Sequence, residues 1–239
     1  MKSTDRRHLK DNDLAVLASN TRQMIDERRK EVTATIAVIA VLGVIALGWF
    51  GWRQHVQSGA QALLADALVL EGAPVGPPTT PGAKEVRFAT EREKMEAELS
   101  KYKATADQYP STDAGIFARY REASIQMALG KPTEAATLFQ DVISRAGSRV
   151  YGQMAQLGLA EAQANSGSFD QAITTFKSLS ENKDATIPVD GVLMQLGRAY
   201  RDAGKKTEAQ QTFNRIVEEF PESPFTTDAK RELDNLKKG

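Results

Sequence analysis

The chain contains no cysteine, and only two of its 239 residues are histidines, His8 and His55. Without cysteine it can form neither disulfide bonds nor thiolate metal sites. The two histidines lie far apart, so they supply neither a pair of metal ligands nor the base of a catalytic triad. A glycine-rich phosphate-binding loop is missing too. We therefore expect no enzymatic activity, no bound metal and no cofactor.

The chain also lacks a surplus of charge, because 31 basic side chains balance 31 acidic ones. Outside a basic cluster at residues 28–30 it has no basic stripe, which a protein that binds a phosphate backbone would need. Its carboxylates stand beside Lys and Arg, as at residues 91–94, a pattern typical of solvated helix faces. We expect neither a nucleic-acid partner nor a small-molecule substrate.

A long apolar run is present at residues 32–52, where 21 successive residues carry no charge. At about 1.5 Å per residue, such a helix covers roughly 30 Å, the thickness of the hydrocarbon core of a bilayer. Trp49 and Trp52 stand at one end of the run, where indole rings favour the interface of a membrane. The sequence predicts a transmembrane helix at 32–52.

The flanking charges predict the orientation of this span. Residues 1–31 carry eight Lys and Arg, whereas residues 53–83 carry only Arg53. The positive-inside rule then places the leader at 1–31 in the cytoplasm and the rest outside. The apolar run exceeds the 7–15 residues of a cleaved signal peptide, so we expect a retained single-pass anchor.

Beyond the span, apolar residues at helical spacing predict a helix that continues to about Glu71. Four prolines and three glycines at residues 72–82 then predict a loop. Helix resumes near Glu85 and ends before Pro110. We assign 53–84 to a juxtamembrane helix with its loop and 85–239 to an outer domain.

The outer domain repeats itself every 37 residues. The repeated positions are Gly130, Gly167 and Gly204; Ala135, Ala172 and Ala209; and Phe139, Phe176 and Phe213. Periods of 20–50 residues are typical of solenoids, which mostly bind other proteins. The expected helices lie at about 113–129, 132–146, 149–166, 169–181, 188–203, 206–219 and 225–237.

The recurring residues resemble the tetratricopeptide pattern, which requires a small residue in the first helix, a turn glycine, and an alanine followed by an aromatic residue in the second. The clearest copy has Gly197, Gly204, Ala209 and Phe213 at these places. In place of the opening tryptophan this copy has Leu193, and the other two copies have Arg119 and Gln156. We predict an all-α protein in which a transmembrane helix precedes a right-handed, tetratricopeptide-like solenoid of helix pairs.

In such arrays the concave surface comes chiefly from the first helix of each pair. The corresponding positions mix adaptable methionine and aromatic side chains with arginine, which forms bidentate hydrogen bonds. We predict a protein-binding groove lined by Phe117, Tyr120, Arg121, Met154, Leu157, Glu161, Met194, Gln195, Arg198 and Arg201, with Ser124 at a matching position. The alternative is that many of these side chains only pack against the next helix, because the solenoid is short.

A basic leader, one span ending in GWFGWRQHVQSGAQ, an outer helix and a few degenerate repeats together resemble the ancillary SecYEG translocon subunit family of bacterial inner membranes. The resemblance implies a single-pass inner-membrane protein with a cytoplasmic N-terminus and a periplasmic tetratricopeptide-like domain. It further implies a membrane-tethered binding module associated with the protein-export translocon, with periplasmic folding factors, or with exported polypeptides.

The alternative is a scaffold or adaptor of the cell envelope, similar to the tetratricopeptide coordinator of the Tol-Pal system or to outer-membrane assembly proteins. The stretch FPESPFTTDAKREL at 220–233 resembles repeat ends of those scaffolds. They are usually secreted or lipid-anchored, whereas this chain has no lipobox cysteine and a span that we expect to be retained.

Overall fold

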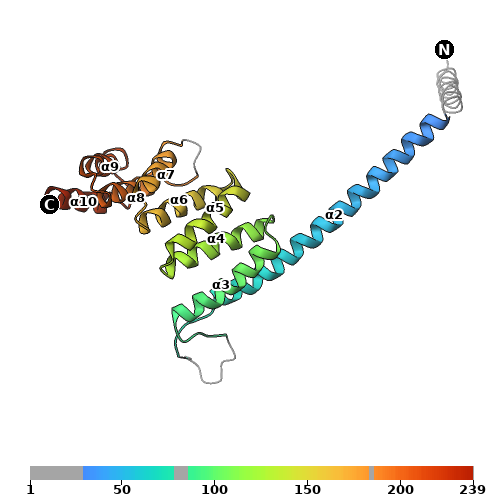
Figure 1. Ribbon diagram of the computed structural model, residues 1–239, viewed down its shortest axis with the longest axis horizontal. Coiled ribbons are helices and arrows are strands. Elements are labelled where there is room, and N and C mark those ends of the chain that lie inside the picture. The colour runs from blue at the N-terminus through green and yellow to red at the C-terminus, as the bar shows by residue number, and fades with distance from the viewer. Residues whose placement is uncertain (1–28, 78–85, 183–185, 239) are drawn as a thin grey trace, which may run out of the picture. The chain divides into compact units, whose positions relative to one another are not determined.

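The computed structural model describes residues 29–77, 86–182 and 186–238 (Figure 1). Most of the predicted leader at 1–31 lies outside these residues. The regular secondary structure of the described residues is helical, apart from one isolated parallel β-bridge between Val75 and Phe88. It divides into two compact units, residues 1–55 and 56–239, and the boundary falls within a single long helix.

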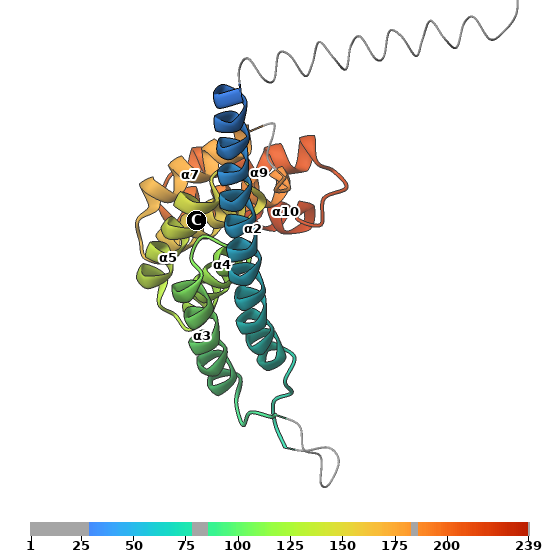
Figure 2. The ribbon, with the colours of Figure 1, turned by 90° about the vertical axis from the view of Figure 1, so that its right-hand side faces the viewer.

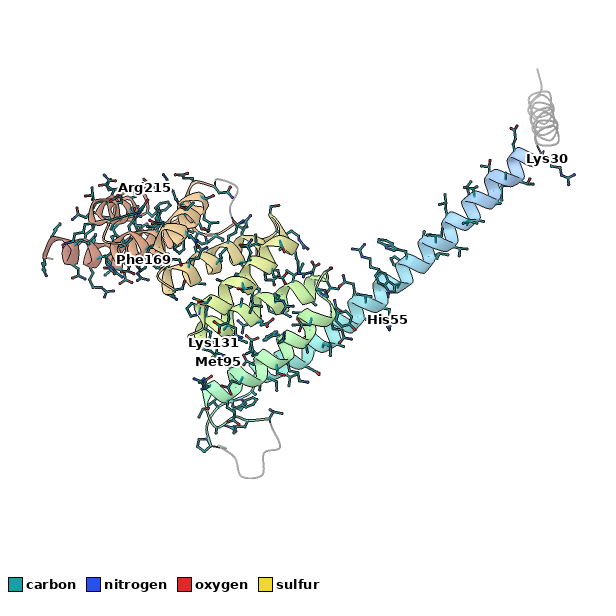
Figure 3. All side chains as sticks on the ribbon, viewed as in Figure 1. Lys30, His55, Met95, Lys131, Phe169 and Arg215 are labelled. Atoms are coloured by element: carbon teal, nitrogen blue, oxygen red, sulfur yellow. The ribbon has the colours of Figure 1, made fainter. Side chains whose placement is uncertain are left out.

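That helix, α2 (Arg29–Glu71), contains the apolar run. In the first unit its large apolar side chains are exposed, including Ile36 at 60%, Leu47 at 73% and Trp52 at 65% (Figure 3). Among the described helices, α2 is the one long and apolar enough to cross a membrane, with a mean hydropathy of 2.3 over its most apolar window. Exposed apolar surface of this extent is unfavourable in water and favourable among lipid chains.

In the second unit, the end of α2 packs beside α3 (Glu91–Gln108), as Figures 1 and 2 both show. Ala67 of α2 and Tyr102 of α3 are both fully buried in one cluster. At the start of α3, the Thr90 hydroxyl accepts a hydrogen bond from the Glu93 amide at 3.1 Å, so the helix is capped at Thr90. The helix predicted from Glu85 thus begins six residues later, at Glu91. Thr90 directly before it supplies the side chain that accepts a hydrogen bond from one of the free N–H groups.

The repeats follow as α4 (Asp113–Ala128) with α5 (Pro132–Ala146), α6 (Val150–Asn165) with α7 (Phe169–Glu181), α8 (Val189–Asp202) with α9 (Lys206–Glu219), and the terminal α10 (Thr226–Lys238). Each of these helices packs on the next, and α4, α6 and α8 also contact one another in sequence. The first helices of the pairs therefore form one layer and the second helices another. The all-α, tetratricopeptide-like prediction is confirmed, with helix bounds within one or two residues of those expected.

The turn glycines explain the strict period. Gly130, Gly167 and Gly204 have φ angles of 75°, 82° and 75°, in the left-handed region that favours glycine. Each follows the end of a first helix, and the chain then turns directly into the second. The 37-residue spacing of these glycines is therefore the spacing of the helical hairpins.

Small residues let neighbouring helices approach closely. A Cβ atom on Gly197 of α8 would overlap the ring of Phe213 in its paired helix α9, and one on Gly158 of α6 would overlap the ring of Phe139 in α5, between successive pairs. Both rings are buried, so they fill the space that the missing side chains leave. The helix pairing read from Gly197 and Phe213 is the one that the structure shows.

The last helix closes the array with a polar outer surface. Leu233 and Leu236 of α10 pack against the core, whereas Lys230 and Asp234 are exposed. Arg201 of α8 donates a hydrogen bond to Glu232 at 2.6 Å. A polar outer face is what a terminal repeat needs in order to stay soluble.

Candidate protein-binding groove

A cavity of about 490 Å³ opens on the layer of first helices, between α4, α6 and the segment that leads into α8. Its lining comes mainly from Tyr120, Met127, Met154, Leu157, Ile187 and Pro188, with Glu161 at one side. The volume lies within the range of about 300–1,000 Å³ that is typical of ligand sites. The structure thus brings Tyr120, Met154, Leu157 and Glu161, four of the predicted groove residues, into one hollow.

Aromatic packing holds Tyr120 at the edge of this cavity. Its ring lies 5.8 Å from that of Phe139 and 6.0 Å from that of Tyr151, measured between centroids. Burial raises the pKa of the Tyr120 hydroxyl, so it stays protonated at neutral pH. The cavity therefore has a rigid aromatic wall with a hydrogen-bonding group on it.

The opposite wall comes from a segment whose role the sequence pattern did not reveal. Gln153 of α6 accepts two hydrogen bonds from Thr186, one from its amide and one from its hydroxyl, each at 2.8 Å. These bonds fix the chain just before Ile187 and Pro188, which line the cavity. The longer connection between α7 and α8, a departure from the usual repeat length, is the sequence feature that supplies this wall.

Glu161 is the charged side chain in the cavity lining. It is half-buried, and its carboxylate accepts a hydrogen bond from the Gln195 amide at 3.4 Å. Loss of water raises its pKa above the ordinary value of 4.5. No cation of the described residues forms an ion pair with it.

A second, more polar hollow of about 350 Å³ adjoins the first on the α8 side. It shares Glu161 with the apolar cavity and adds Gln195 and Arg198, two further residues of the predicted groove. Arg198 forms no hydrogen bond or ion pair with the described residues, so its guanidinium is free to meet a ligand. The groove thus passes from an apolar to a polar section along the layer.

Two predicted groove residues lie at the other end of the layer and serve packing. Arg121 forms an ion pair with Glu71 at 2.7 Å, and its guanidinium lies 5.6 Å from the centre of the Tyr102 ring. The Tyr102 hydroxyl also donates to Glu71, and burial with this bond raises the pKa of Tyr102 to about 12. Phe117 packs edge-on against Tyr102 at 6.2 Å. This group attaches α4 to the end of α2.

Two more residues are also engaged within the fold. Met194 is 1% exposed and belongs to the same core cluster that Leu157 packs against, so it is unavailable to a ligand. Its side chain belongs to the packed core and is not among the residues that line either hollow. Arg201 binds Glu232 and Asp202, at 2.6 and 2.9 Å, and so joins α8 to the terminal helix.

The arginine at the place of the missing tryptophan has a structural role that sequence reasoning did not assign. Arg119 is mostly buried and pairs with Glu122 and Asp107, both at 2.5 Å, and with Asp141 at 3.3 Å. It therefore joins α3, α4 and α5 through charge at the place where the tetratricopeptide pattern has an aromatic side chain. Within the described residues, no group of histidine and carboxylate side chains is arranged to hold a metal ion.

An array of paired helices with a hollow on the layer of first helices defines a tetratricopeptide-like interaction domain, a fold that typically serves as a non-catalytic scaffold for protein binding. The sequence pattern of the family described as "Tetratricopeptide repeat-like domain" matches residues 29–238, and the chain belongs to that family. No curated protein matches the sequence significantly.

Solved structures show the same fold at low sequence identity. TPR-like repeats from Podosopora anserina, assigned to a kinesin light chain, are 15% identical, cover 61% of this chain and 78% of their own, and have a TM-score of 0.53. A tetratricopeptide repeat protein from Parabacteroides merdae is 14% identical, covers 75% of this chain and 60% of its own, and has a TM-score of 0.55. At such identity the likeness concerns the fold alone.

Replacing Glu161 by glutamine is expected to stabilise the protein at neutral pH by about 1 kcal/mol, because an ionised carboxylate is poorly solvated there and glutamine is neutral. The raised pKa means that the folded state binds a proton more readily than the unfolded state does. The difference in stability between the variant and the natural protein should therefore shrink as the pH falls from neutral through the raised pKa of Glu161. Thermal unfolding followed by circular dichroism measures it.

The matched control is Glu134→Gln, at an exposed position of α5. This substitution should change the midpoint temperature of thermal unfolding little at any pH. A Glu161→Gln variant that is less stable at neutral pH would show that the carboxylate makes a stabilising contact.

Proposed function

We propose that this protein is a membrane-tethered module that captures polypeptide segments in the groove between α4, α6 and α8. The observation that carries the proposal is the apolar cavity of about 490 Å³ on the first-helix layer of a tetratricopeptide-like array. Its methionine, leucine and tyrosine side chains can adapt to varied segments. Arg198, without a partner in the described structure, offers a hydrogen-bonding group beside them.

We further propose that α2 anchors this module in a bacterial inner membrane, with residues 1–31 in the cytoplasm, a span at 32–52, and the outer domain from 85 onward in the periplasm. The exposed apolar side chains of α2 support the anchor. The excess of basic residues before the span supports the orientation. Residues 53–84 then connect the membrane to the repeats.

The proposed partners are proteins of the export pathway. A groove attached to the outer face of the inner membrane is placed to meet polypeptides as they leave the export translocon. The resemblance to the ancillary SecYEG translocon subunit family supports the translocon itself and periplasmic folding factors as partners. In this proposal the chain holds or passes on such segments and performs no reaction on them.

The test is purification of the full chain from solubilised membranes, with identification of the proteins that accompany it. The double variant Met154→Gln, Arg198→Gln changes two groove residues that belong to none of the core clusters and form no ion pair, so the fold should be kept. It should recover translocon subunits or folding factors several-fold less efficiently, because a few central contacts dominate binding.

The control is Lys206→Gln, Thr207→Gln, which also removes one positive charge but lies at exposed positions of α9. It should recover partners as the natural protein does. If only peptidoglycan-linked or outer-membrane proteins accompany the chain, the proposal is contradicted in favour of an envelope scaffold. If both variants recover the same partners equally well, the groove does not carry the binding.

A further inference from the structure

The cavity on the first-helix layer has one electrostatic property that a general apolar groove lacks. Among the described residues that line it, Glu161 is the one with a charge. The other polar groups near it are hydroxyls, those of Tyr120, Ser124 and Thr186. The Ser124 hydroxyl is already used, since it donates to the Tyr120 carbonyl at 3.0 Å. An apolar hollow thus contains a single negative charge.

Among the residues that the structure describes, this charge has no counter-ion. Its hydrogen bond to Gln195 comes from a neutral amide. Arg198 lines the adjoining polar hollow and lies beyond ion-pair distance. The other arginines of the layer are paired elsewhere: Arg119 with Asp107 and Glu122, Arg121 with Glu71, and Arg201 with Glu232. Charges removed from water are normally paired, because an unpaired one costs free energy. A carboxylate kept in this position is therefore complementary to a cation that arrives with a ligand.

The surroundings of Glu161 fit a cation on an apolar stem. Met154 and Leu157 precede it on α6 and line the same cavity, where they can cover the methylene groups of a lysine or arginine side chain. The ring of Tyr120 lines the cavity as well and offers a face for a cation. The remaining volume, bounded by Met127, Phe139 and Ile187, suits a second, fully apolar side chain.

We propose that this cavity binds a polypeptide segment in which an aliphatic or aromatic side chain stands next to a basic one. The apolar side chain fills the cavity, and the basic group pairs with the Glu161 carboxylate. This inference rests on the proposed function and names the class of segment that the groove selects. It excludes acidic segments, since a second carboxylate beside Glu161 would be repelled in a poorly solvated site.

The experiment is calorimetric titration of the full chain, held in phosphatidylcholine nanodiscs that carry no net lipid charge. Three peptides of equal length have capped ends, a glycine and serine background and one phenylalanine. They differ only in the next residue, which is lysine, the uncharged norleucine or glutamate. The lysine peptide should bind about tenfold more tightly than the norleucine peptide, and the glutamate peptide most weakly.

Glu161→Gln should remove the difference between the lysine and norleucine peptides to within about twofold, whereas the control Glu134→Gln should keep the tenfold preference. Met154→Gln should weaken both peptides together, because it reduces the apolar wall. A lysine preference that survives Glu161→Gln would place the cation elsewhere and overturn the inference. So would absence of binding by every peptide.

The two failures can be told apart. If all three peptides bind equally well and all depend on Met154, the inference about the basic residue is wrong, while the groove still binds polypeptides. If no peptide binds, and the groove variant also recovers the same partners from membranes as the natural protein does, both the inference and the proposed function fail.

Discussion

Replacing Ala172 by glutamate is expected to lower the melting temperature of the repeat domain steeply or to abolish its cooperative unfolding. Ala172 is fully buried in the core cluster with Phe176 and Leu193. Glutamate there would overfill a close helix contact and bury an unpaired charge, at a cost of about 3–5 kcal/mol. Domains of this kind have only about 5–15 kcal/mol of stability in total. Circular dichroism during heating measures the change.

The matched control is Gln171→Glu, which adds the same charge one residue earlier on α7, at an exposed position. It should leave the melting curve nearly unchanged. If Ala172→Glu also melts like the natural protein, then the 37-residue register is not the register in which the helices pack.

Protease added to intact spheroplasts is expected to degrade residues 53–239 and to leave the leader at 1–31 intact. Eight basic residues before the span against one soon after it keep the leader on the cytoplasmic side. Epitope tags at the two ends of the chain, followed by immunoblotting, show which side the protease reaches.

After detergent treatment both tags should be lost, which controls for a protease-resistant fold. A repeat domain that survives in intact spheroplasts while the leader is clipped would reverse the topology. It would contradict the proposed binding of periplasmic partners.

The fold could be predicted closely because its determinants are local and repeated. Gly130, Gly167 and Gly204 mark the turns through their left-handed backbone conformation, and these turns set the bounds of the helices around them. The buried pair of Gly197 and Phe213 could be recognised because a small residue (Ala123, Ala160, Gly197) and a phenylalanine (Phe139, Phe176, Phe213) recur every 37 residues. Such features depend on a residue and its near neighbours, so a single sequence contains them.

The candidate site was predicted less completely, because exposure depends on what packs from elsewhere. Tyr120, Leu157 and Met194 occupy the same position of successive repeats, yet the first two line the cavity and Met194 is buried. Arg121 is engaged by Glu71, which lies 50 residues earlier in the sequence. No local pattern reports such distant pairings.

The wall formed by Ile187 and Pro188 was missed for a related reason. Sequence reasoning read the stretch around it as a connection between repeats, since nothing in its composition shows that Gln153 fixes Thr186. A departure from the usual repeat length could have indicated it. Extra residues beside a binding face are often what shapes that face.

The most direct test of the account is photocrosslinking in living cells from single positions on the two faces of the array. Probes at Met154 and Leu157 lie in the groove, and probes at Thr174 and Gln211 lie at exposed positions of the second helices. The account predicts strong, discrete crosslinks to export machinery, folding factors or newly exported chains from the groove positions, and few from the other two. Equal labelling from both faces would contradict it.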